Sequence, residues 1–219
     1  MKYTLYYAAG AASFAVHWLL VDLGAEYEAV RLDLDRKDQK GSHYLRLNPA
    51  GRVPTLVIDG IPYAEAAALL LMIAEEHPDR PLVPAPGSRD RFAFLQHYFF
   101  LANTLQPAFR AWFYPHEPAG AEQEEAVMAS ARVQIEAAWD RVDAMLAGGP
   151  YLFGAELSVA DYLAVMLMRW SRNMPKPAAA WPNISAYLHK IALIPSLAEV
   201  HAREELPFWP VGAQLGEGQ

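Results

Sequence analysis

The pattern of structural signals changes at a proline-rich stretch, and this change limits the chain to folds with two parts. Residues 1–78 alternate short strand and helix signals, whereas residues 89–206 carry almost only helical ones. Between them, PDRPLVPAPGS at residues 78–88 holds four prolines and one glycine in eleven positions. Proline has no backbone N–H to donate, so this stretch suits an exposed connector. We therefore predict a domain at residues 1–78, a linker at 79–88 and a second domain at 89–219.

The first domain is predicted to be a small mixed sheet with helices. Its regular elements are expected at Tyr3–Tyr7, Ser13–Gly24, Tyr27–Leu32, Thr55–Ile58, Ile61–Tyr63 and Glu65–Glu76, with Ser13 as a helix cap and a short irregular helix before the third strand. The dipeptide Asp59-Gly60 is a strong hairpin signal. A strand–helix–strand start closed by an antiparallel hairpin matches the thioredoxin topology, although other small α/β domains share this order.

The second domain is predicted to be entirely helical. Two long helices are expected at Arg89–Trp112 and Ala121–Ala147, and shorter ones near Ile184–Ala192 and Ser196–Glu204. A further helix opens at Leu157-Ser158-Val159-Ala160-Asp161, the pattern of a capping box, in which the hydroxyl and the carboxylate satisfy free amides at the helix start. The expected fold class is thus an α/β thioredoxin-like domain followed by an all-α domain.

Composition and charge exclude several kinds of partner. The 219 residues are 53% hydrophobic, which is enough for a sizeable core, and the net charge is −7 without a long basic run. This charge should repel nucleic acid and anionic lipid. No run of 18 apolar residues and no secretion signal is visible, so we expect a cytoplasmic protein without a membrane segment.

The absence of cysteine removes further chemistries. With no cysteine, the chain cannot form disulfides, thiolate metal sites or a thiol nucleophile of its own. The seven histidines are scattered, and a metal would need three or four converging ligands. We expect no metal site, and any sulfur chemistry must use a borrowed thiol.

The most informative segment is NPAGRVP at residues 48–54, directly before an expected strand. Asn-Pro-x-Gly favours a turn, and Val53-Pro54 at a strand entrance is a place where a cis prolyl bond can be held. Such a bond would turn the main-chain groups of Val53 off the sheet, where an extended peptide ligand could pair with them. The alternative is an edge-strand proline in a plain turn.

The motif N-P-x-G-x-V-P, followed about ten residues later by Glu65 at a helix start, resembles the glutathione-binding signature of cytosolic glutathione transferases, and the resemblance spans the chain. It implies that Arg52 contacts the glycyl carboxylate, that Val53 and Pro54 hold the cysteinyl backbone, and that Glu65 with Ala66 holds the γ-glutamyl end. The family usually has serine where this chain has Ala66. Loss of that hydroxyl should weaken affinity by roughly 1 kcal/mol.

Catalysis in this family means lowering the pKa of the glutathione thiol, because the thiolate is the nucleophile. The junction YYAAGAASFAVHW is similar to that of the bacterial beta class, which carries a cysteine where this chain has Ala12. The donors left are Ser13, Tyr6 and Tyr7. Ser13 is the first choice because it lies beside free amides at a helix start, although it can also be only a cap.

The beta class also uses a histidine in the first long helix of the second domain, where this chain has Ala102 or Asn103. Mixed-disulfide chemistry is therefore not expected, whereas transfer through a bound thiolate remains open. The resemblance further implies a pocket for the second substrate. Its candidate residues are Phe109, Trp112, Phe113 and Tyr114, with Trp170, Trp181, Phe208 and Trp209 as weaker ones.

The resemblance implies a homodimeric glutathione transferase that conjugates or reduces small apolar electrophiles, with glutathione as co-substrate and no bound cofactor. Two alternatives stay open. Loss of both beta-class catalytic residues fits a non-catalytic glutathione-binding or scaffold protein. The junction AAGAAS also partly resembles the serine-rich junction of glutathione-dependent isomerases of maleylacetoacetate type.

Overall fold

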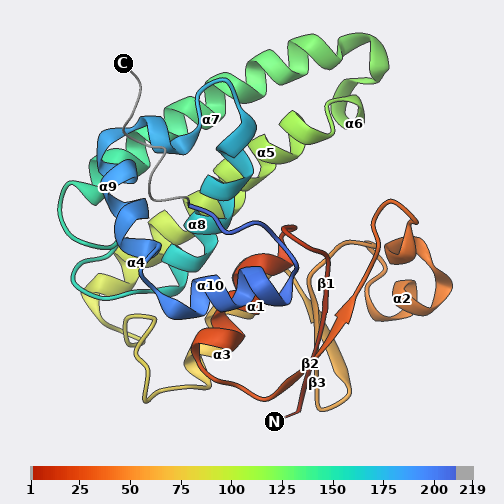
Figure 1. Ribbon diagram of the computed structural model, residues 1–219, viewed down its shortest axis with the longest axis horizontal. Coiled ribbons are helices and arrows are strands. Elements are labelled where there is room, and N and C mark those ends of the chain that lie inside the picture. Colours follow the sequence, from red (N-terminus) through yellow and green to blue (C-terminus); the bar gives the residue numbers. More distant parts are fainter. Residues whose placement is uncertain (1, 211–219) are drawn as a thin grey trace. The chain divides into compact units, whose positions relative to one another are not determined.

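A computed structural model describes residues 2–210, and these residues form two compact units (Figure 1). The first unit contains residues 2–83 together with Ala192–Trp209, and the second contains Pro84–Ile191. Sequence analysis predicts that all residues after 88 belong to the helical domain. The structure differs because helix α10, Pro195–Arg203, packs against helix α1, Ser13–Asp22, in the first unit. No helix in the described range is long and apolar enough to cross a membrane.

The first unit contains a four-stranded sheet in the order β2-β1-β3-β4. Strand β1 pairs in parallel with β2 and antiparallel with β3, and β3 pairs antiparallel with β4. The bounds of the four strands are Tyr3–Tyr7, Tyr27–Arg31, Thr55–Ile58 and Ile61–Ala64. Asp59 and Gly60 both have positive φ, 48° and 89°, as a two-residue type I′ hairpin requires. The predicted thioredoxin-like topology is confirmed.

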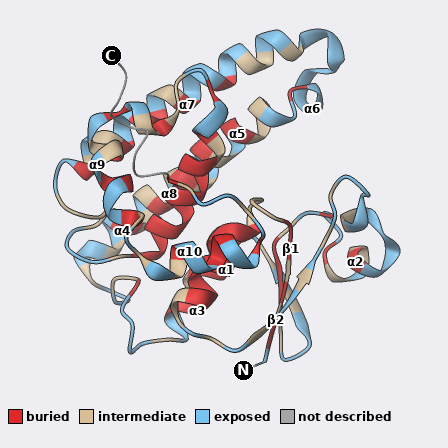
Figure 2. Ribbon diagram, in the orientation of Figure 1, coloured by how far each residue is buried: buried red, intermediate tan, exposed pale blue. Residues whose placement is uncertain are grey.

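Helix α1 forms the core of this unit. It contacts β1, α10 and helix α3, Ala66–Glu75. Every residue from Ser13 to Val21 is buried, and Figure 2 shows the helix mostly in the colour of buried residues. This burial explains why α1 is apolar around its circumference rather than along one stripe. The unit also contains helix α2, Ser42–Leu47, and a short 3₁₀ turn at Asp38–Lys40.

The second unit is a helical bundle built around α8, in which every residue from Val159 to Arg169 is buried. Helix α7 packs against α5 and α9. The helices of this unit are α4 Arg89–Phe100, α5 Gln106–Phe113, α6 His116–Ala119, α7 Glu124–Leu146, α8 Val159–Trp170 and α9 Pro182–Ile191. The predicted all-helical character is confirmed.

One predicted helix is interrupted. The sequence predicts a single helix over residues 89–112, whereas the structure has a π-helical segment, Leu101–Leu105, between α4 and α5. Pro107 lies just after this segment. A proline inside a helix has no N–H and its ring clashes with the carbonyl four residues earlier, here that of Asn103. A wider π turn relieves this conflict without ending the helix.

The predicted capping box at the start of α8 is confirmed. Asp161 Oδ2 accepts hydrogen bonds from the N–H and the hydroxyl of Ser158, both at 2.8 Å. Its Oδ1 accepts from the N–H of Leu152 at 3.1 Å and from the hydroxyl of Tyr187 at 2.9 Å. Burial raises the pKa of Asp161, and these hydrogen bonds oppose the rise. Asp161 therefore joins three segments of the bundle.

We predict that Asp161→Ala lowers the free energy of unfolding by at least about 2 kcal/mol, because several buried donors lose their acceptor at about 1–3 kcal/mol each. Urea unfolding measures this change. Glu125→Ala, which removes an exposed acid from the first turn of α7, is the control and should change stability by less than about 0.5 kcal/mol. Equal midpoints for Asp161→Ala and wild type would contradict the prediction.

Candidate functional site

The strand register brings the expected site residues to one edge of the sheet. Tyr6 on β1 pairs with Thr55 on β3, and Thr55 pairs with Ala64 on β4. The residues just outside these positions therefore leave the sheet at the same edge: Ala8 after β1, Pro54 before β3 and Glu65 after β4. The start of α1 lies beyond Ala8. This edge thus gathers the three segments that sequence analysis selected.

The turn before β3 is held by two buried side chains. The Val53–Pro54 peptide bond is cis, as predicted. The Asn48 side-chain amide donates to the carbonyl of Arg52 at 2.8 Å, and the Tyr44 hydroxyl donates to the same carbonyl at 2.6 Å. Both side chains also lie within hydrogen-bond distance of the Thr55 hydroxyl, at 3.2 and 2.8 Å. Sequence analysis gave Asn48 only a turn role and did not identify Tyr44.

Gly51 in this turn cannot be replaced without strain. Its φ is +58°, and a Cβ there would lie 2.8 Å from the carbonyl oxygen of Gln39 and 2.8 Å from Nζ of Lys40. The 3₁₀ turn at Asp38–Lys40 therefore packs directly on the glycine. The Lys40 ammonium also donates to the carbonyl of Ala50 at 3.3 Å. These contacts fix the backbone immediately before Arg52.

Several polar groups at this edge have no hydrogen-bond or ion-pair partner within residues 2–210. They are the main-chain N–H and C=O of Val53, the guanidinium of Arg52 and the carboxylate of Glu65. Arg52 and Glu65 are exposed, and Val53 is half-buried. Unfilled backbone groups at a sheet edge can pair with an extended peptide. A cation and an anion accompany them at the same edge.

Glu65 has an unusual backbone conformation, with φ 72° and ψ 101°. A non-glycine residue held there costs on the order of 1–3 kcal/mol and is typical of ligand-binding positions. Its side chain makes no capping hydrogen bond to α3, whose first residue is the buried Ala66. The N–H of Ala66 has no acceptor within residues 2–210 and suits a carboxylate ligand. The carboxylate of Glu65 is thus free for an ammonium group.

Ser13 does not cap α1, in contrast to the sequence-based expectation. The cap position is Ala12, and Ser13 is the first helical residue. The buried hydroxyl of Ser13 accepts from the N–H of Ala8 and donates to the carbonyl of Ala8, both at 3.1 Å. Its single proton is therefore directed at a main-chain oxygen. In this arrangement Ser13 closes the turn between β1 and α1.

Tyr6 and Tyr7 point to opposite faces of the sheet, as neighbouring strand residues do. The half-buried ring of Tyr6 lies 5.6 Å from that of Tyr44 on α2, measured between centroids. The buried ring of Tyr7 lies 4.9 Å from the ring of His17 on α1. Burial raises the pKa of Tyr7, and Glu204 adds to the rise, so its hydroxyl stays protonated. Only Tyr7 shares the face on which α1 packs.

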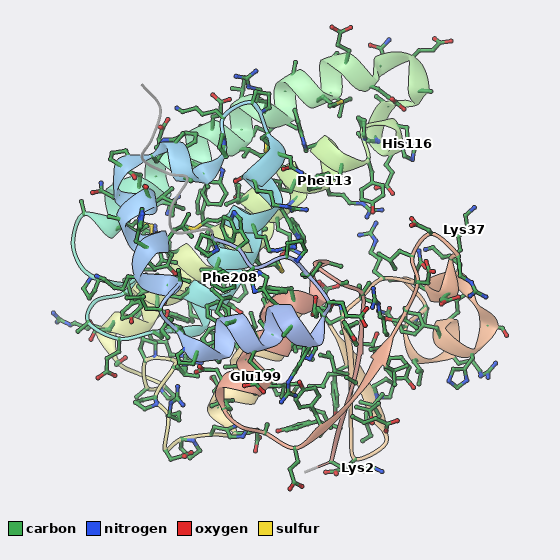
Figure 3. The ribbon with its side chains drawn as sticks, viewed as in Figure 1. Lys2, Lys37, Phe113, His116, Glu199 and Phe208 are labelled. Atoms are coloured by element: carbon green, nitrogen blue, oxygen red, sulfur yellow. The ribbon has the colours of Figure 1, made fainter. Side chains whose placement is uncertain are left out.

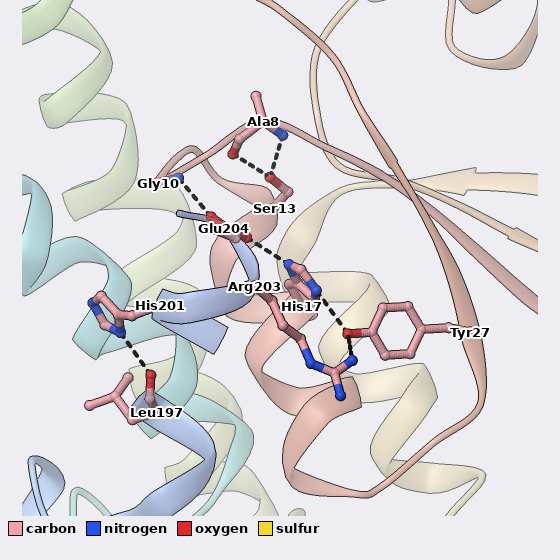
Figure 4. Close-up of polar contacts among 9 residues, drawn as sticks. All are labelled: Ala8, Gly10, Ser13, His17, Tyr27, Leu197, His201, Arg203 and Glu204. Carbon is pink, nitrogen blue, oxygen red and sulfur yellow. Dashed lines mark hydrogen bonds and ion pairs between the residues drawn. The ribbon is translucent and has the colours of Figure 1, made fainter. Parts of the chain in front are cut away.

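Sequence analysis missed a buried polar network behind this junction (Figure 4). Glu204, fully buried, contacts both Gly10 in the turn and His17 on α1. His17 in turn contacts Tyr27, which accepts from Arg203. Gly10 and Glu204 are 194 positions apart, so no local pattern predicts their contact. The described residues contain no group of three or more potential metal-ligating side chains.

The aromatic candidates of the helical unit divide into core and surface. Phe109 is fully buried, with Trp139 and Trp170 around it at ring-centroid distances of 6.1 and 5.8 Å. Phe113, at the end of α5 in Figure 3, stacks on Phe109 and is 48% exposed. Tyr114 is 39% exposed. Phe113 and Tyr114 can therefore contact a ligand, whereas Phe109 supports them from the core.

The remaining aromatic candidates have different surroundings. Trp112 and Trp170 are half-buried, and the ring of Trp170 lies edge-on to Phe113 at 6.2 Å. Trp181 is buried, and its indole N–H donates to Asp140 at 2.7 Å. Phe208 and Trp209 belong to the first unit. Of this set, Trp112 and Trp170 can extend the surface made by Phe113.

Within residues 2–210, the fold is a thioredoxin-like domain with unpaired main-chain groups, a cation and an anion at one sheet edge, followed by a helical unit. Residues 1–75 match the family described as "Glutathione S-transferase, N-terminal domain", and residues 125–190 match "Glutathione S-transferase, C-terminal domain". The chain belongs to the glutathione S-transferase family.

Individual relatives agree with this assignment. Glutathione S-transferase GstA of Escherichia coli O157:H7 is 27% identical over 92% of this chain and 98% of its own. A sphingomonad glutathione S-transferase solved with glutathione is 35% identical, with a TM-score of 0.80 over 94% of this chain and 100% of that one. A beta-class enzyme of Sphingomonas chungbukensis is 32% identical, with a TM-score of 0.81 over the same shares.

We predict that Asn48→Ala lowers the free energy of unfolding by about 2 kcal/mol, because the Arg52 carbonyl and the Thr55 hydroxyl each lose a donor. Tyr44→Phe should cost about 1 kcal/mol. Thermal unfolding followed by circular dichroism measures both. His43→Ala on the exposed side of α2 is the control. An unchanged midpoint for Asn48→Ala would show that the turn does not depend on its side chain.

Proposed function

We propose that this protein binds glutathione at the sheet edge and uses its thiol to conjugate or reduce small apolar electrophiles. One observation carries the proposal: within residues 2–210 the main-chain groups of Val53 have no partner, and at the same sheet edge Arg52 supplies an unpaired cation and Glu65 an unpaired anion. Glutathione offers a matching set, namely an extended cysteinyl backbone, a glycyl carboxylate and a γ-glutamyl ammonium group. Family membership supports the same ligand.

Each end of the peptide meets suitable chemistry. Arg52 is permanently charged and suits the glycyl carboxylate. Glu65 suits the α-ammonium group, and the N–H of Ala66 at the start of α3 suits the α-carboxylate. Ala66 contributes no hydroxyl there, so the α-carboxylate is bound by a main-chain donor alone. We expect binding to be weaker by roughly 1 kcal/mol than with a serine at that position.

The thiolate needs a donor near the start of α1. The hydroxyl proton of Ser13 is directed at Ala8, and the N–H groups of Gly10 and Ala11 are bonded to Glu204 and Ala8. The N–H of Ala12 has no partner within the described residues. We infer that this amide, at the positive end of the α1 dipole, holds the sulfur together with the hydroxyl of Tyr7. Ser13 then acts by keeping the turn closed.

The electrophile is proposed to contact the exposed rings of the helical unit. Phe113 and Tyr114 are its main contacts, and Trp112 extends them; Phe109 only supports Phe113 from below. Such a surface favours planar, weakly polar molecules because it offers ring faces and edges. We also propose that the protein is a cytoplasmic homodimer without a bound cofactor.

Arg52→Ala and Glu65→Gln should each raise the dissociation constant for glutathione by about tenfold or more, since each removes a charge-assisted hydrogen bond of about 1.5–3 kcal/mol. Isothermal titration calorimetry measures the change. The matched controls are Arg46→Ala on α2 and Glu26→Gln at the opposite sheet edge, both exposed. If both site variants bind as well as the controls, the sheet edge is not the glutathione site.

Turnover of a chlorodinitrobenzene-type electrophile shows which hydroxyl donates a hydrogen bond to the thiolate. Tyr7→Phe should lower kcat/KM by about tenfold, whereas Tyr6→Phe, on the other face of the sheet, should leave it unchanged. Loss of turnover in Ser13→Ala with unchanged stability would instead make that hydroxyl the sulfur donor. Retention on immobilised glutathione without turnover would favour the scaffold alternative, and isomerisation without consumption of glutathione would favour the isomerase.

A further inference from the structure

A carboxylate from the C-terminal segment reaches the turn that precedes α1. Glu204 follows α10 and is fully buried in the first unit. Its Oε2 accepts the N–H of Gly10 at 2.7 Å, and its Oε1 lies 2.8 Å from Nδ1 of His17 (Figure 4). A buried carboxylate without such partners would cost several kcal/mol. One oxygen of Glu204 thus contacts the turn between β1 and α1, and the other contacts α1 itself.

A chain of contacts continues beyond His17. Arg203 can only donate, and its guanidinium lies 2.7 Å from the hydroxyl oxygen of Tyr27. That hydroxyl oxygen lies 2.8 Å from Nε2 of His17. Nδ1 of His17 faces the carboxylate of Glu204, which accepts hydrogen bonds. Arg203, Tyr27 and His17 thus form one continuous chain of contacts to Glu204.

The network ends where the sulfur of glutathione is proposed to lie. Gly10 has φ +67°, and Glu204 holds its N–H. Ser13 and Ala11 both bond to Ala8, so the turn is fixed from its two ends. Of the amides of Gly10, Ala11 and Ala12, that of Ala12 has no partner within the described residues. A change in the Gly10 peptide plane would therefore move the amide that faces the thiolate.

The surroundings of Glu204 contain few other charges. Tyr7 and Tyr27 pack on His17 with ring centroids at 4.9 and 5.4 Å. His201 belongs to α10 and donates from Nδ1 to the carbonyl of Leu197, within the same helix. The neighbouring Glu205 is exposed and pairs with Arg31 at the surface. The geometry therefore separates Glu204, which is turned inward, from Glu205, which is turned outward.

We propose that Glu204 is a positioning residue for the glutathione thiolate: it fixes the Gly10 peptide and thereby aims the Ala12 amide, while Arg203, Tyr27 and His17 hold Glu204 in place. This inference rests on the proposed function. It also assigns the segment Ala192–Trp209, which follows the helical unit in the sequence, to the thiol site. A positioning role predicts a change in the state of the bound thiol rather than in the affinity for the peptide.

The test compares Glu204→Ala with Glu205→Gln in the full-length protein. For Glu204→Ala we expect the dissociation constant for glutathione to change by less than about threefold, while kcat falls about tenfold or more. We also expect the pH at which bound glutathione becomes a thiolate, followed by its ultraviolet absorbance, to rise by about one unit. Glu205→Gln should match wild type in all three measurements.

Glu204→Ala is expected to lower stability because it removes the partner of two buried donors, so a second variant is needed. Tyr27→Phe removes only the hydroxyl between Arg203 and His17 and leaves Glu204 in place. It should shift the thiolate transition in the same direction, by a smaller amount. Reduced stability in both variants with an unchanged thiolate transition would overturn the proposal, because the network would then be structural only.

Failure of the proposed function gives a different result. If the wild-type protein does not bind glutathione in calorimetry, glutathione is not its ligand. The inference is then overturned together with the proposed function. A wild type that binds and forms a thiolate, with Glu204→Ala identical to it, overturns only the role of Glu204. The calorimetric arm therefore distinguishes the two failures.

Discussion

Two hydrogen bonds from buried side chains to one carbonyl decide which backbone groups remain free at the sheet edge. Tyr44 and Asn48 both donate to the oxygen of Arg52, at 2.6 and 2.8 Å, so this carbonyl is fully engaged with the protein. The peptide that follows, at Val53, has no partner in the described chain. Because a buried backbone group must normally be paired, leaving this pair open favours a ligand that supplies the missing partners. The fold thus holds the turn rigidly and leaves the ligand-facing peptide unsatisfied.

Along the same sheet edge, other polar groups also divide into those hydrogen-bonded within the protein and those without a partner in the described residues. Ser13 closes its turn through Ala8, Glu204 engages Gly10, and Ala12 retains a free amide. Ser13, which sequence analysis proposed for chemistry, here supports the turn, while the proposed ligand contacts combine main-chain groups with the side chains of Arg52 and Glu65. Glu65 combines an unusual backbone conformation with a carboxylate that has no partner in the described residues. The proposed thiol site of this chain without cysteine relies on a main-chain amide together with the hydroxyl of Tyr7.

Local sequence signals predicted the structural features that depend on residues close together in the chain. Strand β3 was placed at its observed bounds, the hairpin followed from Asp59-Gly60, and the capping box followed from Ser158 and Asp161. The expectation that Ser13 caps α1 was wrong, because a hydroxyl beside a helix start can bond backward to Ala8 as well as cap. The π-helical segment was missed because the constraint of Pro107 was not weighed. The Gly10–Glu204 contact has no local signature, since it depends on tertiary packing of α10.

The position of Ala192–Trp209 has a consequence for how the protein folds during its synthesis. The unit that contains the sheet lacks α10 and Glu204 until the ribosome has synthesised the whole helical unit. Until then, one side of α1 is uncovered and apolar, and the Gly10 turn lacks its carboxylate. N-terminal domains usually fold first during synthesis, but here completion of the first-made unit has to wait for α10. A fragment that stops at Val83 should therefore expose α1 and aggregate.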